Sequence, residues 1–193
     1  MTDDAADAAD AADADRGGDA ETVADAEAPT GSRDRFATLW DRVEADLEAT
    51  AEEYREADWD VTTLDVGDVT PLPSARPNAD RDRVGLDALV PGKQFDALRE
   101  TVDDHAFDEY ETYRAAAGDV TFLVLVMRDT DAGLAVMLPL FYVREEAEAW
   151  LEAAREDGET NTYVRPLTDD ERVVFHHEDP EPFFPPEAGD QAS

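Results

Sequence analysis

The most regular hydrophobic pattern in the chain begins just after Ser32. From Phe36 to Tyr54, apolar side chains recur at intervals of mostly three and four residues, the spacing of one helix face. Ser32 is a suitable N-cap because its side-chain oxygen can accept a backbone N–H of the first turn. The pattern predicts a helix of about six turns. Its apolar stripe could form a short coiled coil, but a stripe of barely three heptads favours packing on the protein's own sheet.

Two further helices are predicted later in the chain. Phe95, Leu98 and Val102 lie on one face of a helix of about three turns that follows Pro91 and Gly92. Residues 144–157 form the other, with two glutamates in the first turn, where the helix dipole favours acidic side chains.

The strand signals are runs rich in β-branched and aromatic residues. Pro71, Pro73 and Pro77 separate the first two runs and predict a long loop. The segment 120–127 is apolar on both faces, which is typical of a central strand, whereas Pro139 places part of its neighbour at an edge or bulge. The strands are expected at residues 59–66, 84–90, 108–116, 120–128, 133–143, 160–167 and 172–177.

These elements predict an α+β fold with a mostly antiparallel sheet, because the turns at residues 118–119 and 129–133 are short enough for hairpins. Three helices are expected to cover the sheet mainly on one face. Strand, helix, strand and strand occur in residues 84–127 and again in 134–177. The helices of the two halves align poorly, so both a duplication and a chance recurrence stay open.

Composition divides the chain into three parts. Residues 1–32 hold ten acids and one base, Arg16, and have too few large apolar side chains to offset the entropy of ordering, so we expect a disordered acidic tail. Residues 33–178 are expected to form a single α+β domain, and residues 179–193 a Pro-containing C-terminal tail. Within that tail, Phe183 and Phe184 suit either a docking motif or packing on the domain's own sheet.

The charge of the chain indicates the solvent in which it works. Fifty acidic residues against fifteen arginines and one lysine give a formal net charge of -34. Such self-repulsion destabilises a compact state in dilute buffer, but at about 1 M salt the Debye length is only ~3 Å. The composition is therefore typical of a halophilic protein surrounded by hydrated potassium ions.

The same charge bears on partners and location. An acidic surface in concentrated salt argues against binding to nucleic acid or to anionic membranes. No apolar run reaches the roughly 20 residues of a membrane-spanning helix, and the N-terminal residues lack a signal-peptide pattern, so a cytoplasmic protein is expected. Cysteine is absent, which excludes disulfides and thiolate metal sites.

A ligand site for an anion or small molecule is one functional hypothesis. Lys93, the only lysine, stands at a predicted helix start, where backbone N–H groups favour anions. Arg76, Arg81 and Arg83 lie in the predicted long loop, and guanidinium groups suit phosphate or carboxylate. Aspartates alternate with these arginines, so local ion pairing also explains the segment.

A metal-dependent enzyme is another hypothesis, centred on His176, His177 and Glu178, because imidazole and carboxylate are ligands of zinc and iron. Successive strand residues point to opposite faces, however, so both imidazoles reach one ion only if the strand ends or bulges between them. Known nucleotide-binding and hydrolase motifs are absent, and no serine has a histidine close to it in the sequence. Whether the protein is an enzyme stays uncertain, with the balance against catalysis, and no cofactor is expected.

The acidic Ala-Asp segment, the helix around Trp40, the turn PGKQFDAL and the strands VTFLVLVM and AVMLPLFYV together resemble a family of uncharacterised haloarchaeal proteins, a domain of unknown function. The resemblance covers most of residues 33–186 and implies a lineage and a compartment, but no activity. The first functional hypothesis is consequently a non-catalytic binding or protein-interaction domain. A homo-oligomer, formed through a sheet edge or the first helix, or another protein partner is expected.

Overall fold

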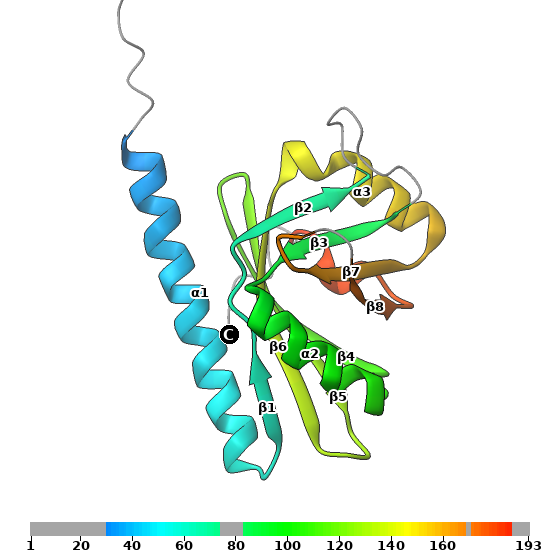
Figure 1. Ribbon diagram of the computed structural model, residues 1–193. Coiled ribbons are helices and arrows are strands. Elements are labelled where there is room, and N and C mark those ends of the chain that lie inside the picture. Colours follow the sequence, from blue (N-terminus) through cyan, green and yellow to red (C-terminus); the bar gives the residue numbers. More distant parts are fainter. Residues whose placement is uncertain (1–29, 74–82, 169–170, 187–193) are drawn as a thin grey trace, which may run out of the picture.

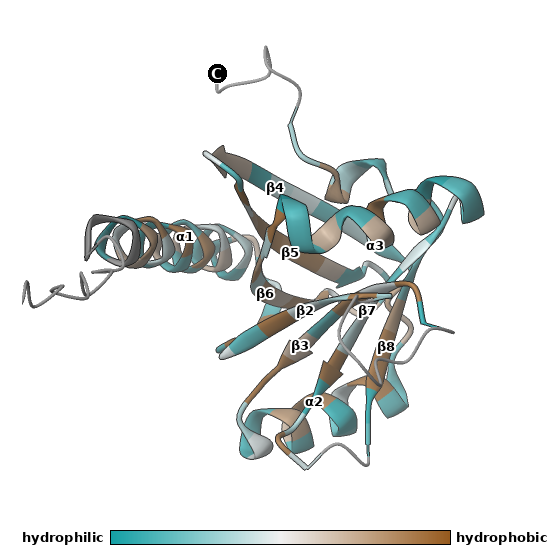
Figure 2. Ribbon diagram, turned by 90° about the horizontal axis from the view of Figure 1, so that it is seen from above, coloured by the Kyte–Doolittle hydropathy of each residue, from teal (hydrophilic) through white to brown (hydrophobic). Residues whose placement is uncertain are grey.

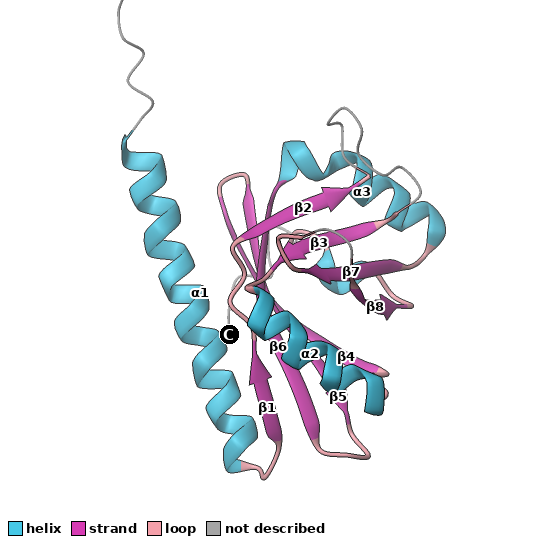
Figure 3. Cartoon of the chain, viewed as in Figure 1, coloured by secondary structure: helices cyan, strands magenta, loops and turns pink. Residues whose placement is uncertain are grey.

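The computed structural model describes residues 30–73, 83–168 and 171–186 (Figure 1). These ranges contain three α-helices, eight strands and one short 3-10 helix, coloured by type in Figure 3. The helices are α1 (Thr30–Glu56), α2 (Gly92–Asp104) and α3 (Arg144–Asp157), and the 3-10 helix is η1 (Glu181–Phe183). The strands are β1 (Asp60–Thr63), β2 (Asp68–Leu72), β3 (Gly85–Leu89), β4 (Glu109–Ala117), β5 (Val120–Asp129), β6 (Leu134–Val143), β7 (Thr160–Arg165) and β8 (Val173–His177).

The α+β class is confirmed, but the strands form two four-stranded sheets where the sequence predicted one. Sheet A has the order β1-β6-β5-β4 and sheet B the order β2-β3-β7-β8. Four of the six strand pairs are antiparallel, whereas β1 with β6 and β3 with β7 are parallel. Both parallel pairs join strands far apart in the sequence, which hairpin signals do not reveal.

The helices lie on two sides of sheet A rather than mainly on one face. In Figures 1 and 2, α1 stands on the outer side of this sheet, away from α2 and α3. Leu47 and Ala51 of α1 are buried there against Val124, Val126 and neighbouring apolar residues, with Phe36 against Phe122 and Phe141. The apolar stripe of the first helix thus packs on the protein's own sheet, as the sequence favoured.

The main core lies between the two sheets and includes α2 and α3. Phe95 and Leu98 of α2 and Trp150 of α3 are buried together with the inner faces of both sheets. Figure 2 shows the hydrophobic colouring along β5 and β6, while much of the surface of α2 and α3 is hydrophilic. Since α2 and α3 bury one face each, their polar faces are left to solvent.

Strand β5 is central, as its apolar sequence predicted, with β6 on one side and β4 on the other. The neighbouring strand β6 contains Pro139, which lies opposite Val124 of β5. β1 pairs only with residues Leu134 to Met137 of β6, so in the described residues no strand pairs with Pro139 on the side away from β5. The proline, which lacks an N–H, is therefore at a local edge, as expected.

Strand β2 was not predicted, because Pro71 and Pro73 favoured a loop. Pro71 in fact pairs with Leu86 at the edge of sheet B, where a missing N–H costs no ladder hydrogen bond. Residues 74–82, the remainder of the predicted loop, lie outside the described residues.

The two strand-helix-strand-strand halves use their strands differently. In the first half, β3 belongs to sheet B and the β4–β5 hairpin to sheet A; in the second, β6 belongs to sheet A and the β7–β8 hairpin to sheet B. Each single strand therefore pairs with the hairpin of the other half, but in different ways. β6 pairs antiparallel with β5, the second strand of the β4–β5 hairpin, whereas β3 pairs parallel with β7, the first strand of the β7–β8 hairpin. The shared element order is therefore not matched by equivalent pairing.

The ends of the domain differ in part from the predicted division. Helix α1 begins at Thr30, two residues before Ser32, and residues 1–29 of the predicted tail 1–32 lie outside the described residues. At the other end, Phe183 is fully buried, and its carbonyl accepts a hydrogen bond of 2.9 Å from Tyr142 Oη. Packing on the domain, rather than docking elsewhere, therefore accounts for Phe183. In the described residues, no helix has the length and apolar character to span a bilayer.

Candidate functional site

A cleft of about 750 Å³ opens between the free edge of sheet B and the segment that joins α2 to β4. One wall is residues 172–176, from Arg172 through the first four residues of β8, together with Glu178. The other wall comes from the last turns of α2 and from residues between His105 and Tyr110. A volume of this size falls within the usual range of small-molecule sites.

The β8 wall is a strand edge. In the described part of the chain, β8 pairs with β7 alone and ends the order of sheet B. Val173, Phe175 and His177 are buried, while Val174 and His176 are exposed, the alternation expected of a strand with one face on the core. Because five successive residues line the cleft, both faces of the strand and the backbone edge between them border it.

Aromatic side chains form the middle of the cleft. The rings of Phe107 and Phe175 meet edge to face at 5.9 Å, joining the two walls. Further along, the Tyr110 hydroxyl donates a hydrogen bond of 2.6 Å to the carbonyl of Asp179. Val174, with half of its surface exposed, adds an apolar side chain to the β8 wall.

The charged residues are segregated along the cleft. At the start of β8, Arg172 lies beside the ion pair of Arg99 with Glu171, whose atoms are 2.7 Å apart. Asp108 and Glu178 lie near the other end, where the Tyr110 hydroxyl bonds to Asp179. Arg99 and Arg172 thus form a basic end and Asp108 and Glu178 an acidic end, on either side of the apolar middle, while Asp103, one helical turn after Arg99 on α2, also lines the cleft.

His105 stands between this cleft and a smaller hollow of about 390 Å³ next to β1 and β6. Its Nδ1 lies 3.2 Å from Oδ2 of Asp129, which is almost buried at the end of β5. The backbone N–H of Ala132, donating to Asp129 at 3.0 Å, lowers the pKa of this carboxyl, and His105 lowers it further. Asp129 therefore stays ionised and fixes the orientation of the imidazole at the cleft.

The structure does not bring the three predicted metal ligands together. His177 is fully buried, with Nε2 2.9 Å from Oγ1 of Thr162, whereas His176 is on the opposite, exposed face near Asn161 and Glu159. Glu178 lies at the cleft. No group of three or more histidine or acidic side chains suited to a metal ion occurs in the described residues.

The predicted anion ligands are also separated. Lys93 is exposed in the first turn of α2, after β3, while Arg83 lies just before β3, with its guanidinium 5.6 Å from the centre of the Tyr163 ring. The five residues of β3 span about 17 Å, so these two cations do not share one small ligand. Arg76 and Arg81 lie outside the described residues.

Arg83 instead belongs to a charged group on the outer face of sheet B. Arg165 Nε donates to Oδ1 of Asp87 at 2.9 Å, and Arg172 approaches the other carboxylate oxygen at 3.9 Å. Burial raises the pKa of Asp87, and the charges of Arg165, Arg172 and Arg83 oppose that rise. The buried carboxylate of Asp87 therefore holds Arg172 between sheet B and the basic end of the cleft.

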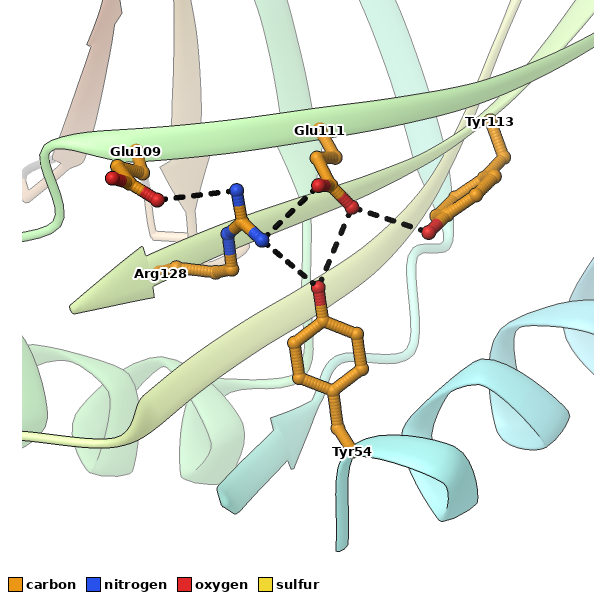
Figure 4. A network of polar contacts seen from close by, with 5 residues as sticks. All are labelled: Tyr54, Glu109, Glu111, Tyr113 and Arg128. Atoms are coloured by element: carbon orange, nitrogen blue, oxygen red, sulfur yellow. Dashed lines mark hydrogen bonds and ion pairs between the residues drawn. The ribbon is translucent and has the colours of Figure 1, made fainter. Parts of the chain in front are cut away.

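A second polar cluster, the Arg128 network, joins α1 to sheet A (Figure 4). Arg128 of β5 contacts Glu109 at 3.2 Å and Glu111 at 3.1 Å, both on β4, and its Nη1 donates to the Tyr54 hydroxyl at 3.4 Å. Tyr113 donates to the same Glu111 carboxylate at 3.2 Å. Burial is the main cause that raises the pKa of Tyr54. The cluster is well suited to fix the end of α1.

Comparison with known proteins assigns the chain to a family. Residues 6–185 match a family of unknown function, DUF7529. The chain belongs to this family. No curated protein and no solved structure matches it. Because the function of the family is unknown, membership assigns no activity to the cleft.

Of the residues that line the cleft, His176 and Glu178 were candidates from the sequence, as metal ligands, but the cleft itself was not predicted. Arg172 and Tyr110 were placed only within predicted strands, and Arg99 was not singled out. They meet because β8 and the start of β4, which are more than sixty residues apart, border the same cleft. The local sequence of neither segment indicates this contact, because it depends on tertiary packing.

Proposed function

We propose that this protein is a non-catalytic binding domain and that the cleft along β8 is its binding site. The observation that carries the proposal is the cleft of about 750 Å³ with an aromatic middle and opposite charges at its ends. Apolar walls with a few placed charges are typical of ligand sites, because the apolar surface gives affinity and the charges fix orientation.

The geometry favours this function over the two alternatives. A metal-dependent enzyme around His176, His177 and Glu178 has little support, because the two imidazoles occupy opposite faces of β8. An anion receptor built from Lys93 and the loop arginines has little support, because Lys93 and Arg83 flank opposite ends of β3. The cleft instead uses Arg99 and Arg172, which the fold brings to one place.

The proposal includes the medium in which binding occurs, the potassium-rich cytoplasm of a halophilic archaeon. The net charge of -34 and the strong preference for arginine over lysine support it. In such salt, long-range attraction is screened, so affinity has to come from apolar contact and from hydrogen bonds at short range. The aromatic middle of the cleft meets that requirement.

A fluorescence titration with anilinonaphthalene sulfonate in multimolar potassium chloride tests the proposal. This probe combines aromatic rings with one anionic group, and we expect a single saturable site on the native protein. Val174→Glu replaces an exposed apolar wall residue and should raise the dissociation constant about tenfold, the effect of losing one apolar contact.

The matched control is Ala115→Glu, which adds the same charge at an exposed strand position on the other sheet. It should leave the dissociation constant unchanged, while circular dichroism shows that both variants are folded. Absence of saturable binding, or equal weakening by both substitutions, would contradict the assignment of the cleft.

A further inference from the structure

We propose that the ligand of the cleft is an extended peptide, which binds as an additional strand against the free edge of β8. This inference rests on the proposed function and narrows its ligand to one chemical class. It would extend sheet B from four strands to five.

The β8 wall presents a strand edge to the cleft. A small-molecule pocket is normally lined by side chains from one face of each strand, but here five successive residues, Arg172 and the first four residues of β8, border the cleft. Such a wall presents alternate backbone N–H and C=O groups along its edge, the groups that a bound strand pairs with. The five successive residues 172–176 span about 17 Å, enough for a peptide of five or so residues.

The size of the opening also favours a single extended chain as the ligand. The opposite wall, the end of α2 and the start of β4, is joined to the β8 side by one contact at each end of the cleft. Arg99 pairs with Glu171 at 2.7 Å, and the Tyr110 hydroxyl bonds to the Asp179 carbonyl at 2.6 Å. A cleft of about 750 Å³ between such walls suits a single extended chain and is too small for the edge of a folded sheet with its covering layers.

The charged and apolar side chains of the cleft match a peptide of alternating sequence. The basic end lies at Arg172 and the acidic end at Glu178, with Phe107 and Phe175 between them. An antiparallel peptide would place its N-terminal part beside Glu178 and its C-terminal part beside Arg172. The expected ligand therefore begins with a basic residue, ends with an acidic one, and carries apolar side chains at alternate positions between them.

The test uses the full chain in multimolar potassium chloride and a labelled peptide, Lys-Thr-Val-Thr-Val-Thr-Glu with both ends blocked, followed by fluorescence anisotropy. Two further peptides carry N-methyl groups, one on both valines and the other on the first two threonines. Because these two sets of amides point to opposite edges of a strand, methylation of only one set should interfere with pairing. We expect one methylated peptide to bind at least about tenfold more weakly and the other to bind like the parent.

Direction is tested with the peptide Glu-Thr-Val-Thr-Val-Thr-Lys, whose charges are exchanged and whose composition is the same. It should bind about threefold more weakly, a small factor because salt screens the end charges. Equal or tighter binding would overturn the antiparallel direction. Binding of the parent peptide should also fall with Val174→Glu and not with Ala115→Glu.

Two outcomes separate the failure of this inference from the failure of the proposed function. If anilinonaphthalene sulfonate saturates the cleft while the parent peptide fails to bind, or while both methylated peptides bind like the parent, the strand-addition inference is wrong and the binding site stands. If neither the probe nor the peptide binds, both are wrong.

Discussion

The His177 imidazole is enclosed by the core, where it contacts the rings of Tyr110 at 4.5 Å and Phe183 at 4.6 Å. Burial lowers the pKa of His177 to about 3, and the neighbouring His176 lowers it as well. The folded protein therefore holds this side chain neutral, while the unfolded chain protonates it near pH 6.5.

This difference predicts a loss of stability in acid. As the pH falls below about 6.5, the unfolded state binds the proton and the folded state does not, so the free energy of unfolding decreases until the pH reaches about 3. At about pH 5 the contribution of His177 should be a loss of about 2 kcal/mol relative to neutral pH. Urea unfolding over a pH series, at constant potassium chloride concentration, measures it.

His177→Gln should remove this acid-dependent part, because glutamine does not titrate. The carboxylates contribute to both proteins, so the difference between wild type and variant isolates the histidine. His176→Gln, on the exposed face of β8, is the control and should keep the wild-type slope. An unchanged slope in the His177 variant would show that this imidazole does not titrate differently on folding.

Trp150 is the second residue with a specific prediction. It is fully buried, its Nε1 donates a hydrogen bond of 2.9 Å to Thr160 Oγ1, and its ring meets Tyr142 edge to face. Trp150→Phe removes the bond and leaves a cavity, and it should lower the free energy of unfolding by about 2–3 kcal/mol. Trp40→Phe on partly exposed α1 should cost less than about 1 kcal/mol in the same denaturation experiment, and similar losses would contradict the difference in burial.

At the scale of single residues, the sequence predicted the direction in which a side chain points, but not which residues surround it. The alternation of strand residues correctly indicated that His176 and His177 face opposite ways. It did not reveal that Tyr110 and Phe183, far away in the chain, enclose His177. Such contacts depend on tertiary packing, which the local pattern of hydrophobic residues does not contain.

At the scale of elements, the attachment of α1 depends on two kinds of contact. Leu47 and Ala51 are buried on sheet A, and the Arg128 network holds the helix near its C-terminal end (Figure 4). Arg128 is more buried than the carboxylates it joins, and its removal leaves Glu109 and Glu111 side by side without their cation.

Arg128→Gln should therefore reduce the free energy of unfolding by about 1–2 kcal/mol. Arg55→Gln, which breaks only surface ion pairs with Glu48 and Glu52 on α1, should cost less than about 0.5 kcal/mol. Hydrogen exchange should also be faster near Tyr54 in the Arg128 variant. If exchange in α1 is unchanged, the network does not secure the helix.

The order of elements was largely readable from the sequence, and the exception has a clear cause. All three helices and seven of the eight strands coincide with predicted segments, because each carries a regular apolar period. The missing strand, β2, contains Pro71 within a Pro-rich stretch, and only its edge position makes it compatible with pairing. Whether a strand lies at the edge of a sheet depends on the tertiary fold. The local sequence does not contain this information, and its prolines therefore favoured a loop.

At the scale of the whole molecule, the division into two sheets was beyond sequence reasoning. Hairpins were predicted from short turns, and both β4–β5 and β5–β6 were found. The parallel pairs β1–β6 and β3–β7 join distant segments, and nothing in either segment identifies its partner. The cleft follows from that arrangement, so its residues could not be grouped in advance.

The charge of -34 leads to a prediction for the entire protein. In dilute buffer the carboxylates repel one another, whereas concentrated salt screens them, so the thermal midpoint should rise steeply as potassium chloride is added. Circular dichroism melting curves across a salt series measure this. A midpoint that is the same in dilute buffer and in saturated potassium chloride would contradict adaptation to brine.

The most direct test of the central claim is a map of where a ligand binds. Two-dimensional amide NMR spectra of the full chain, recorded during titration with anilinonaphthalene sulfonate in concentrated potassium chloride, provide that map. The account predicts shifts concentrated in residues 172–178 and in the segment from Arg99 to Tyr110, the two walls of the cleft. Shifts centred instead on α1 and the outer face of sheet A, or spread evenly over the molecule, would contradict it.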